Sequence, residues 1–331
     1  MPNLITTRRG LLRTGAAAGL TLSAPSIVRA QGTWPTKPIT IVVNFPAGGL
    51  TDGIARAFGQ HVSQATGQQV LIDNKPGASG NIGAAMVARA PADGHTFLHS
   101  VSSTLIQNRV LFKTLGFDPD KDFTIVSGTP SGVLPVVVHK SVPVTNLKDF
   151  IGYARTNKVN FGSWALGSSA HIFAQALNEK YGLKMEIVTY KGEAPMWQDM
   201  GAGSLQAAMG SPQAMNALLV KGDIRGIVAP SKVRASQLPD VPTSREQGFD
   251  DDSFTFWGWL ALAAPAATPK EVVKKMSDLW VAGADSEPGR KMMQGFGLVE
   301  KPLNHEEVTA DYEKQKGILI PRVVALGLKP E

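Results

Sequence analysis

Short apolar runs alternate with longer segments of helical periodicity along most of this chain. The alternation is typical of βαβ units, in which helices cover a parallel sheet. It predicts two α/β halves. Strands are predicted at residues 39–43, 70–72, 96–100, 134–139, 160–162, 185–190, 207–209 and 224–228, and helices at 51–65, 80–90, 171–181 and 194–202.

Two segments with a similar pattern bear on the domain organisation. VLPVVVHKSVPV is followed by NLKDFIGYAR, and FWGWLALAAPAAT by PKEVVKKMSDLW; in each, a helix with an early acid follows an apolar strand and a proline-bearing loop. If both strands cross between the halves, domain 1 is discontinuous, with residues 31–132 plus 255–331, and domain 2 is 133–254. On pattern alone, the alternative that any two α/β units look like this stays open.

The first thirty residues read as a leader. TTRRGLLR precedes an Ala- and Gly-rich apolar stretch and then Val28-Arg29-Ala30, which is typical of a twin-arginine export signal cut after Ala30. The alternative, a membrane anchor, fits less well because the apolar stretch is shorter than the ~20 residues of a membrane span. We therefore expect a periplasmic protein.

Charge and cysteine content exclude several classes of protein. The leader holds four arginines and no acid, so its removal lowers the net charge from +6 to +2. Without a basic cluster in the rest of the chain, we expect no nucleic-acid partner. Zero cysteines exclude disulfides and thiolate sites, and the histidines show no metal-binding spacing. We expect neither a metal nor a cofactor.

NFPAGGLTDGIARAF, residues 44–58, places two glycines between a predicted strand and a predicted helix. The free N–H groups of a helix start bind anions at this edge of a sheet, and glycine lets a ligand approach the backbone. Neither nucleotide pattern, GxxxxGK[ST] or GxGxxG, is present, so a carboxylate fits better than a phosphate. The other reading is a tight turn in which Thr51 or Asp52 caps the helix.

A second turn of this kind contains Gly167, Ser168 and Ser169, with His171 in the first turn of the next predicted helix. Ser168 and Ser169 either donate to an anion or simply cap the helix. An alternative function is a secreted serine hydrolase that uses Ser168 and His171, with Asp52 orienting the histidine. Three residues along a helix start do not by themselves form a Ser-His pair, and GxSxG is absent.

Six segments together have the pattern of a known family: WPTKPITIVVNFPAGGLTDGIAR, VLIDNKPGASGNIGAAMVARAPADGHTFL, GSSAHIFAQALNEKYG, VTYKGEAPMWQDMGAGSLQAAM, LPDVPTSREQGF and WGWLALAAPAATP. In these segments, and along its whole mature length, the chain resembles the Bug-type (Bordetella uptake gene) solute receptors of tripartite tricarboxylate transporters. The resemblance implies a two-lobed periplasmic-binding-protein type II fold with two crossing strands at the hinge. It also implies a monomeric receptor, not an enzyme, that closes on a small organic acid and serves integral-membrane transporter subunits.

The resemblance also implies the binding residues. One carboxylate would be held by the first loop, with further donors in two other loops, and we add Ser211, which follows a predicted strand of the second half, as a candidate. These residues are Phe45, Pro46, Ala47, Gly48, Gly49, Asp52, Ser102, Ser103, Thr104, Gly167, Ser168, Ser169, His171 and Ser211. We read Asp52 chiefly as the helix cap that holds the loop, because an inward carboxylate would repel the ligand.

Two departures from the family pattern bear on ligand choice. Met209-Gly210-Ser211 stands where many relatives have an acid, so we expect no acidic group at that position of the cleft and favour a ligand without an amino group. Leu50 stands where a small Ser or Thr is common, which favours a ligand with hydrocarbon or aromatic character.

Overall fold

A computed structural model describes residues 34–250, 254, 258–325, 327 and 330. Every element named below lies within residues 35–331. The predicted export signal at residues 1–30 lies outside the described residues.

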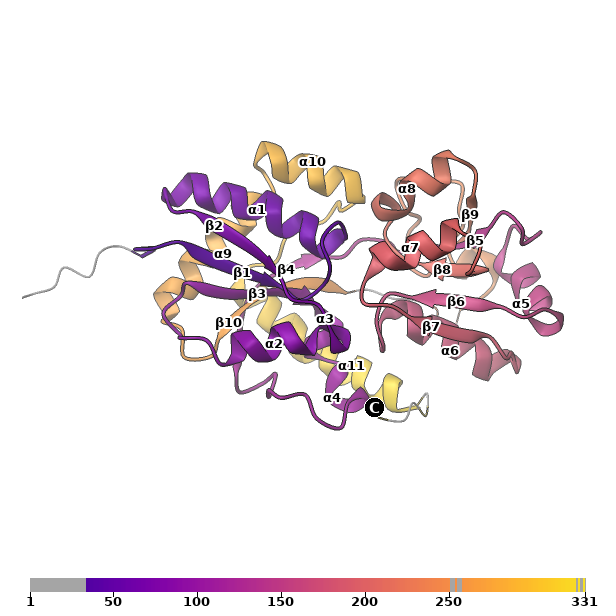
Figure 1. Ribbon diagram of the computed structural model, residues 1–331, viewed down its shortest axis with the longest axis horizontal. Coiled ribbons are helices and arrows are strands. Elements are labelled where there is room, and N and C mark those ends of the chain that lie inside the picture. Colours follow the sequence, from indigo (N-terminus) through magenta and orange to yellow (C-terminus); the bar gives the residue numbers. More distant parts are fainter. Residues whose placement is uncertain (1–33, 251–253, 255–257, 326, 328–329, 331) are drawn as a thin grey trace, which may run out of the picture. The chain divides into compact units, whose positions relative to one another are not determined.

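The first sheet has five strands in the order β2-β1-β3-β10-β4 (Figure 1). β1 is parallel to β2 and β3, whereas β10 is antiparallel to β3 and β4. Strand β10 is buried along its whole length, which explains its continuous apolar sequence WLALAAP. The strands are β1 (Ile39–Val43), β2 (Val70–Asn74), β3 (Thr96–Val101), β4 (Phe123–Pro130) and β10 (Trp259–Pro265).

The second sheet has five strands in the order β7-β6-β8-β5-β9. β6 is parallel to β7 and β8, and β5 is antiparallel to β8 and β9. Val136, Val137 and Val138 of β5 are fully buried, so this strand forms part of the hydrophobic core. The strands are β5 (Val136–His139), β6 (Asn160–Ser163), β7 (Glu186–Thr189), β8 (Ala207–Met209) and β9 (Ile224–Val228).

Both sheets are mixed, so the expectation of parallel sheets is wrong for one strand in each. After β4 the chain leaves the first sheet and continues as β5 of the second sheet. Leu134, just before β5, lines the same pocket as Pro230, just after β9. β10 also begins at this pocket, after Gly258. A strand that starts at the edge where its neighbours end must run antiparallel to them. The domain boundaries at residues 132 and 254 stay a prediction.

The helices cover both faces of the sheets, and Figure 1 shows α1 and α2 on opposite sides of the first sheet. α1 packs against α9 and α10, while α11 packs against β4. The helices are α1 (Leu50–Thr66), α2 (Asn81–Ala88), α3 (Ser102–Leu105), α4 (Asn108–Leu111), α5 (Leu147–Thr156), α6 (Ser169–Tyr181), α7 (Glu193–Gly201), α8 (Pro212–Val220), α9 (Lys270–Gly283), α10 (Glu287–Phe296) and α11 (His305–Ala325).

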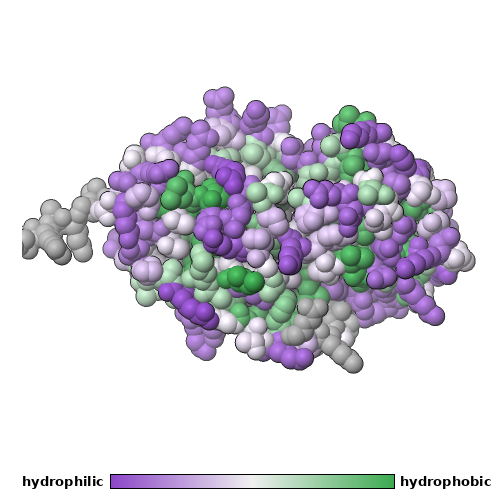
Figure 2. Space-filling model, in the orientation of Figure 1, coloured by the Kyte–Doolittle hydropathy of each residue, from purple (hydrophilic) through white to green (hydrophobic). Residues whose placement is uncertain are grey.

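The surface drawn in Figure 2 is mainly hydrophilic, with separate hydrophobic spots. In the described part of the chain, no helix has both the length and the apolar character needed to cross a membrane.

Candidate functional site

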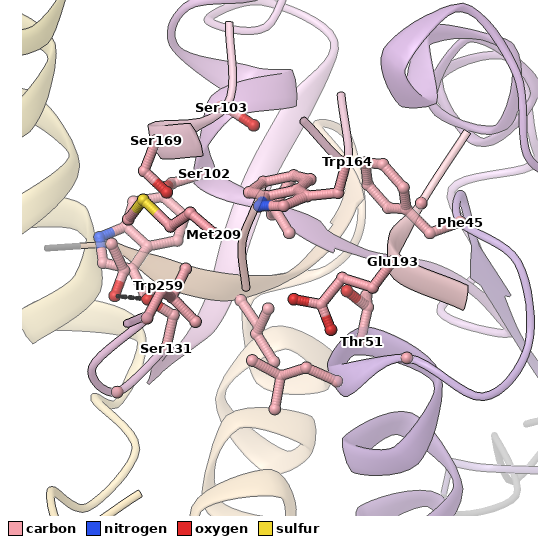
Figure 3. Close-up of a pocket in the computed structure, with 18 of the residues that line it drawn as sticks. Phe45, Thr51, Ser102, Ser103, Ser131, Trp164, Ser169, Glu193, Met209 and Trp259 are labelled. Atoms are coloured by element: carbon pink, nitrogen blue, oxygen red, sulfur yellow. Dashed lines mark hydrogen bonds between the residues drawn. The ribbon is translucent and has the colours of Figure 1, made fainter. Parts of the chain in front are cut away.

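A pocket lies where strands of the two sheets end or begin (Figure 3). The segments after β1, β3 and β4 line it on the side of the first sheet. On the side of the second sheet it is lined by the segments after β6, β7 and β9 and by the last residue of β8. It encloses about 960 Å³ of empty space, part of which is open to solvent. Among the described residues that line the pocket, only Glu193 has an ionisable side chain.

Aromatic side chains from the two sheets meet at this pocket. Phe45, after β1, and Trp164, after β6, pack edge to face with ring centroids 6.0 Å apart. Trp164 is only 9% exposed, and its Nε1 has no hydrogen-bond partner among the described residues. The pocket thus contains a buried N–H donor that a ligand could satisfy.

The α1 turn contributes Gly49, Leu50 and Thr51 to the pocket wall. Gly49 is the N-cap and Leu50 the first helical residue, so the N–H groups of the first turn have no acceptor within the helix. The positive end of this 17-residue helix therefore faces the pocket. Leu50 adds apolar contact there, as the sequence suggested.

Asp52 holds the turn but is not its N-cap, which corrects one expectation. Its Oδ2 accepts hydrogen bonds from Gly48 N at 3.1 Å and Arg56 Nε at 3.0 Å, and its Oδ1 accepts one from Asn74 Nδ2 at 3.0 Å. Burial alone would raise the pKa of this carboxyl, but these bonds hold it below its ordinary value. Asp52 is thus a buried residue whose hydrogen bonds stabilise the loop from inside the protein.

The α6 turn assigns different roles to its two serines. Ser169 lines the pocket, whereas Ser168 is fully buried and is the N-cap of α6. The Ser168 Oγ accepts from His171 N at 3.2 Å and lies 2.9 Å from Ser163 Oγ. Burial lowers the pKa of His171 to about 4.

These contacts do not form the catalytic arrangement that a serine hydrolase would require. A nucleophile must be accessible and paired with a base, whereas Ser168 is buried and its hydroxyl contacts Ser163 and a backbone amide. Asp52 binds Arg56 and Asn74 instead of orienting a histidine.

The segment after β3 forms the short helix α3, from which Ser102 and Ser103 reach the pocket. Thr104 is fully buried and donates instead to Ser79 O at 3.1 Å. His99, in the strand β3 that precedes α3, donates a hydrogen bond from Nδ1 to Thr51 O at 3.0 Å, and burial lowers its pKa to about 4. Through this hydrogen bond to Thr51, the neutral histidine stabilises the first turn of α1.

Glu193 is an acidic group that the sequence interpretation missed. It begins α7, and its carboxylate accepts from Ser211 N at 2.8 Å through Oε1 and from Ser211 Oγ at 2.5 Å through Oε2. Ser211 itself is buried behind it. Residues 209–211 themselves supply no acid, but Glu193 of another helix places a carboxylate next to them.

The predicted site residues fall into two groups. Those that line the pocket are Phe45, Pro46, Gly49, Ser102, Ser103 and Ser169. Those outside its lining are Ala47, Gly48, Asp52, Thr104, Gly167, Ser168, His171 and Ser211. The sequence interpretation assigned no ligand contact to Gln107, Ser131, Trp164, Glu193, Met209, Trp259 or Leu319, which also line the pocket. Several of them directly follow or precede strands, which was the signal that could have found them.

Two α/β halves that share a pocket at their strand ends define a two-lobed solute-binding protein. Residues 54–319 match the family described as the tripartite tricarboxylate transporter family receptor. The chain belongs to this family, and the Bug-type resemblance and two-lobed α/β fold class are confirmed.

Similar proteins support the same assignment. Protein BugT of Bordetella pertussis is 30% identical over 268 residues, which cover 80% of this chain and 82% of BugT. The structure of R. palustris Rpa4515 with adipate has a TM-score of 0.84 and 32% identity, covering 90% of this chain and 100% of that one. The periplasmic binding protein BugD has a TM-score of 0.82 and 25% identity, with coverage of 90% and 100%. MatC from Rhodopseudomonas palustris, with bound malate, has a TM-score of 0.79 and 26% identity, with coverage of 87% and 99%.

Proposed function

We propose that this protein is a periplasmic receptor that binds a small organic carboxylate between its two lobes and delivers it to integral-membrane transporter subunits. The observation that carries the proposal is the start of α1 at the pocket, where Gly49, Leu50 and Thr51 form the wall. Backbone N–H groups at a helix start bind anions without a cationic side chain. The similar structures with adipate and malate support a carboxylate.

Donors from the other lobe would complete the grip on the ligand. Ser169, the first residue of the 13-residue helix α6, lines the pocket opposite the α1 turn, and Trp164 offers its unpartnered Nε1. Because the donors belong to different lobes, they reach one ligand together only when the lobes are closed. Ligand binding would therefore favour the closed state.

The apolar part of the wall favours a ligand with a hydrocarbon portion. Phe45, Leu50, Trp164 and Met209 line the pocket, and burying apolar ligand surface against them contributes about 25 cal/mol per Å². A di- or tricarboxylate or an aromatic acid with a short carbon skeleton fits this combination of donors and apolar surface.

A thermal melt in the presence of organic acids tests the proposal. The mature protein is heated with dicarboxylates, tricarboxylates, aromatic acids and amino acids at millimolar concentration. A ligand at about 1,000 times its Kd adds about 4 kcal/mol to the free energy of unfolding, so at least one acid should raise Tm by several degrees. Turnover of p-nitrophenyl esters that is lost in Ser168→Ala, with no acid shifting the melt, would instead favour a hydrolase.

A further inference from the structure

We propose that Glu193 determines ligand choice by accepting a hydrogen bond from an ammonium group, so that the pocket takes a 2-amino carboxylate. The inference rests on the proposed function, because it assigns the second polar group of the carboxylate ligand. It reverses the preference for a ligand without an amino group that the sequence suggested.

The Glu193 carboxylate is held in place by the turn that contains Gly210 and Ser211. Ser211 donates to both oxygens, from its backbone N at 2.8 Å and its Oγ at 2.5 Å. A Cβ atom at Gly210 would lie 2.8 Å from Glu193 Oε1 and 2.7 Å from the Trp197 ring. Glycine at position 210 therefore leaves room for this carboxylate, which is fixed in the pocket wall and does not extend freely into solvent.

The charge of the pocket favours a positive group next to this carboxylate. No Lys, Arg or His is among the described residues that line the pocket, so the protein supplies no charged partner there. Burial raises the pKa of Glu193 even though Ser211 donates to it, so a positive partner is needed to stabilise the ionised carboxylate. Buried charges are normally paired, and a ligand ammonium would supply the missing charge. A ligand carboxylate in the same place would add a second negative charge.

The position of Glu193 relative to the α1 turn indicates which class of amine the pocket would bind. Figure 3 shows the Glu193 carboxylate beside Thr51, and both residues line the pocket. Thr51 belongs to the first turn of α1, where backbone N–H groups favour a carboxylate. A carboxylate site next to an ammonium acceptor matches a molecule that carries both groups on one carbon atom, and Trp164 Nε1 adds an unpartnered donor to the same pocket.

Calorimetric titration with matched ligand pairs tests this proposal on the wild-type protein. Each pair differs only in the 2-amino group: succinate and aspartate, glutarate and glutamate, adipate and 2-aminoadipate, 3-phenylpropanoate and phenylalanine. A hydrogen bond to a charged group is worth about 1.5–3 kcal/mol, so the amino member of at least one pair should bind at least about tenfold more tightly.

Glu193→Gln, an isosteric variant, removes the charge and keeps an oxygen for Ser211. We expect it to abolish the preference within that pair, with an affinity for the partner lacking the amino group that changes less than about threefold. Glu179→Gln, at an exposed position of α6, is the matched control and should retain the preference. Glu193→Asp, which restores the charge, should recover part of it.

The outcomes separate this inference from the proposed function. Tight binding of an acid without an amino group, with its amino partner equal or weaker, would overturn the role of Glu193 and leave the carboxylate receptor standing. Equal losses for both members in Glu193→Gln would also overturn it. If no member of any pair binds but another organic acid raises Tm, the role of Glu193 is overturned and the carboxylate receptor stands. If no organic acid binds at all, both proposals fail.

Discussion

Gly192, at the start of α7, lies directly against Pro46 of the turn after β1. A Cβ atom at Gly192 would come within 2.7 Å of Pro46 Cδ, and Gly192 has a φ of +127°, a conformation that other residues rarely adopt. These two residues belong to loops of different sheets. This contact joins the two sides of the pocket next to Glu193, so a larger residue at position 192 would push the two loops apart.

Gly192→Ala should therefore weaken ligand binding by at least about tenfold, because the methyl group collides with Pro46 and opposes closure. The affinity is measured by calorimetry with an acid that shifts the melt of the wild type. Gly182→Ala is the control: Gly182 also has a positive φ, of +65°, but nothing lies within 4 Å of its Cβ position. It should lose about 1 kcal/mol of stability and retain its affinity. Equal affinity in both variants would contradict the role of the Gly192 contact.

Substitutions of Gly49 should block the approach of the ligand to the α1 turn in proportion to their size. Gly49 has a φ of −89°, which other residues adopt freely, and a Cβ atom there meets no protein atom within 4 Å. We expect Gly49→Ala to lower the affinity modestly and Gly49→Val to lower it more than about tenfold, with little change in Tm for either. Unchanged affinity in Gly49→Val would move the carboxylate site away from this turn.

Removing the charge of Asp52 should destabilise the fold. Asp52 is 4% exposed, and its carboxylate accepts hydrogen bonds from Gly48, Arg56 and Asn74. Asp52→Asn should therefore cost about 2 kcal/mol in urea unfolding at pH 7. The folded state holds the pKa of Asp52 below its ordinary value. The stabilisation is therefore present above the pKa of the unfolded chain and is lost as the pH falls through the folded pKa. Asp285→Asn, at an exposed pair with Lys301, should change stability by less than about 0.5 kcal/mol.

Two buried histidines should make the protein less stable in mild acid. Burial lowers the pKa of both His99 and His171 to about 4, from 6.5 in an unfolded chain. Between these values the unfolded chain binds protons that the folded chain excludes, so the free energy of unfolding falls as the pH drops from 6.5 to about 4.

His99→Asn tests this pH dependence, because an Asn amide can still donate to Thr51 O. Although the variant is less stable at neutral pH, it should lose about half of the histidine-dependent slope between pH 6.5 and 4.5 in urea unfolding. An unchanged slope would show that His99 does not exclude its proton in the folded state.

The strands and the strand-to-helix turns could be predicted because their signals are local. The run before Asn44 is continuous and apolar because β1 contacts α1 and α2 as well as its neighbouring strands. β4 gave no such signal: Ser127, Gly128 and Thr129 interrupt its apolar run. In the fold, Ser127 Oγ donates to Leu303 O at 2.7 Å, and the Cβ position at Gly128 is 2.6 Å from Val308. These partners are far away in the sequence.

The site was harder to predict because its polarity depends on pairs of distant residues. Nothing local distinguishes Ser168, which caps α6, from Ser169, which reaches the pocket. Glu193 follows a strand and a glycine, as a helix-capping residue would, and its place in the pocket depends on Ser211 eighteen residues later. Sequence reasoning located the turns that surround the pocket and six of the residues that line it, but not Trp164 or Glu193.

The most direct test of the central claim is calorimetric titration of the mature protein with organic acids and with their uncharged primary amides. The amide has nearly the shape of the acid but lacks the negative charge that the N–H groups at the start of α1 favour. We predict one-to-one binding of at least one acid and binding at least about tenfold weaker for its amide. An amide that binds as tightly as its acid, or the failure of every acid to bind, would contradict a carboxylate receptor.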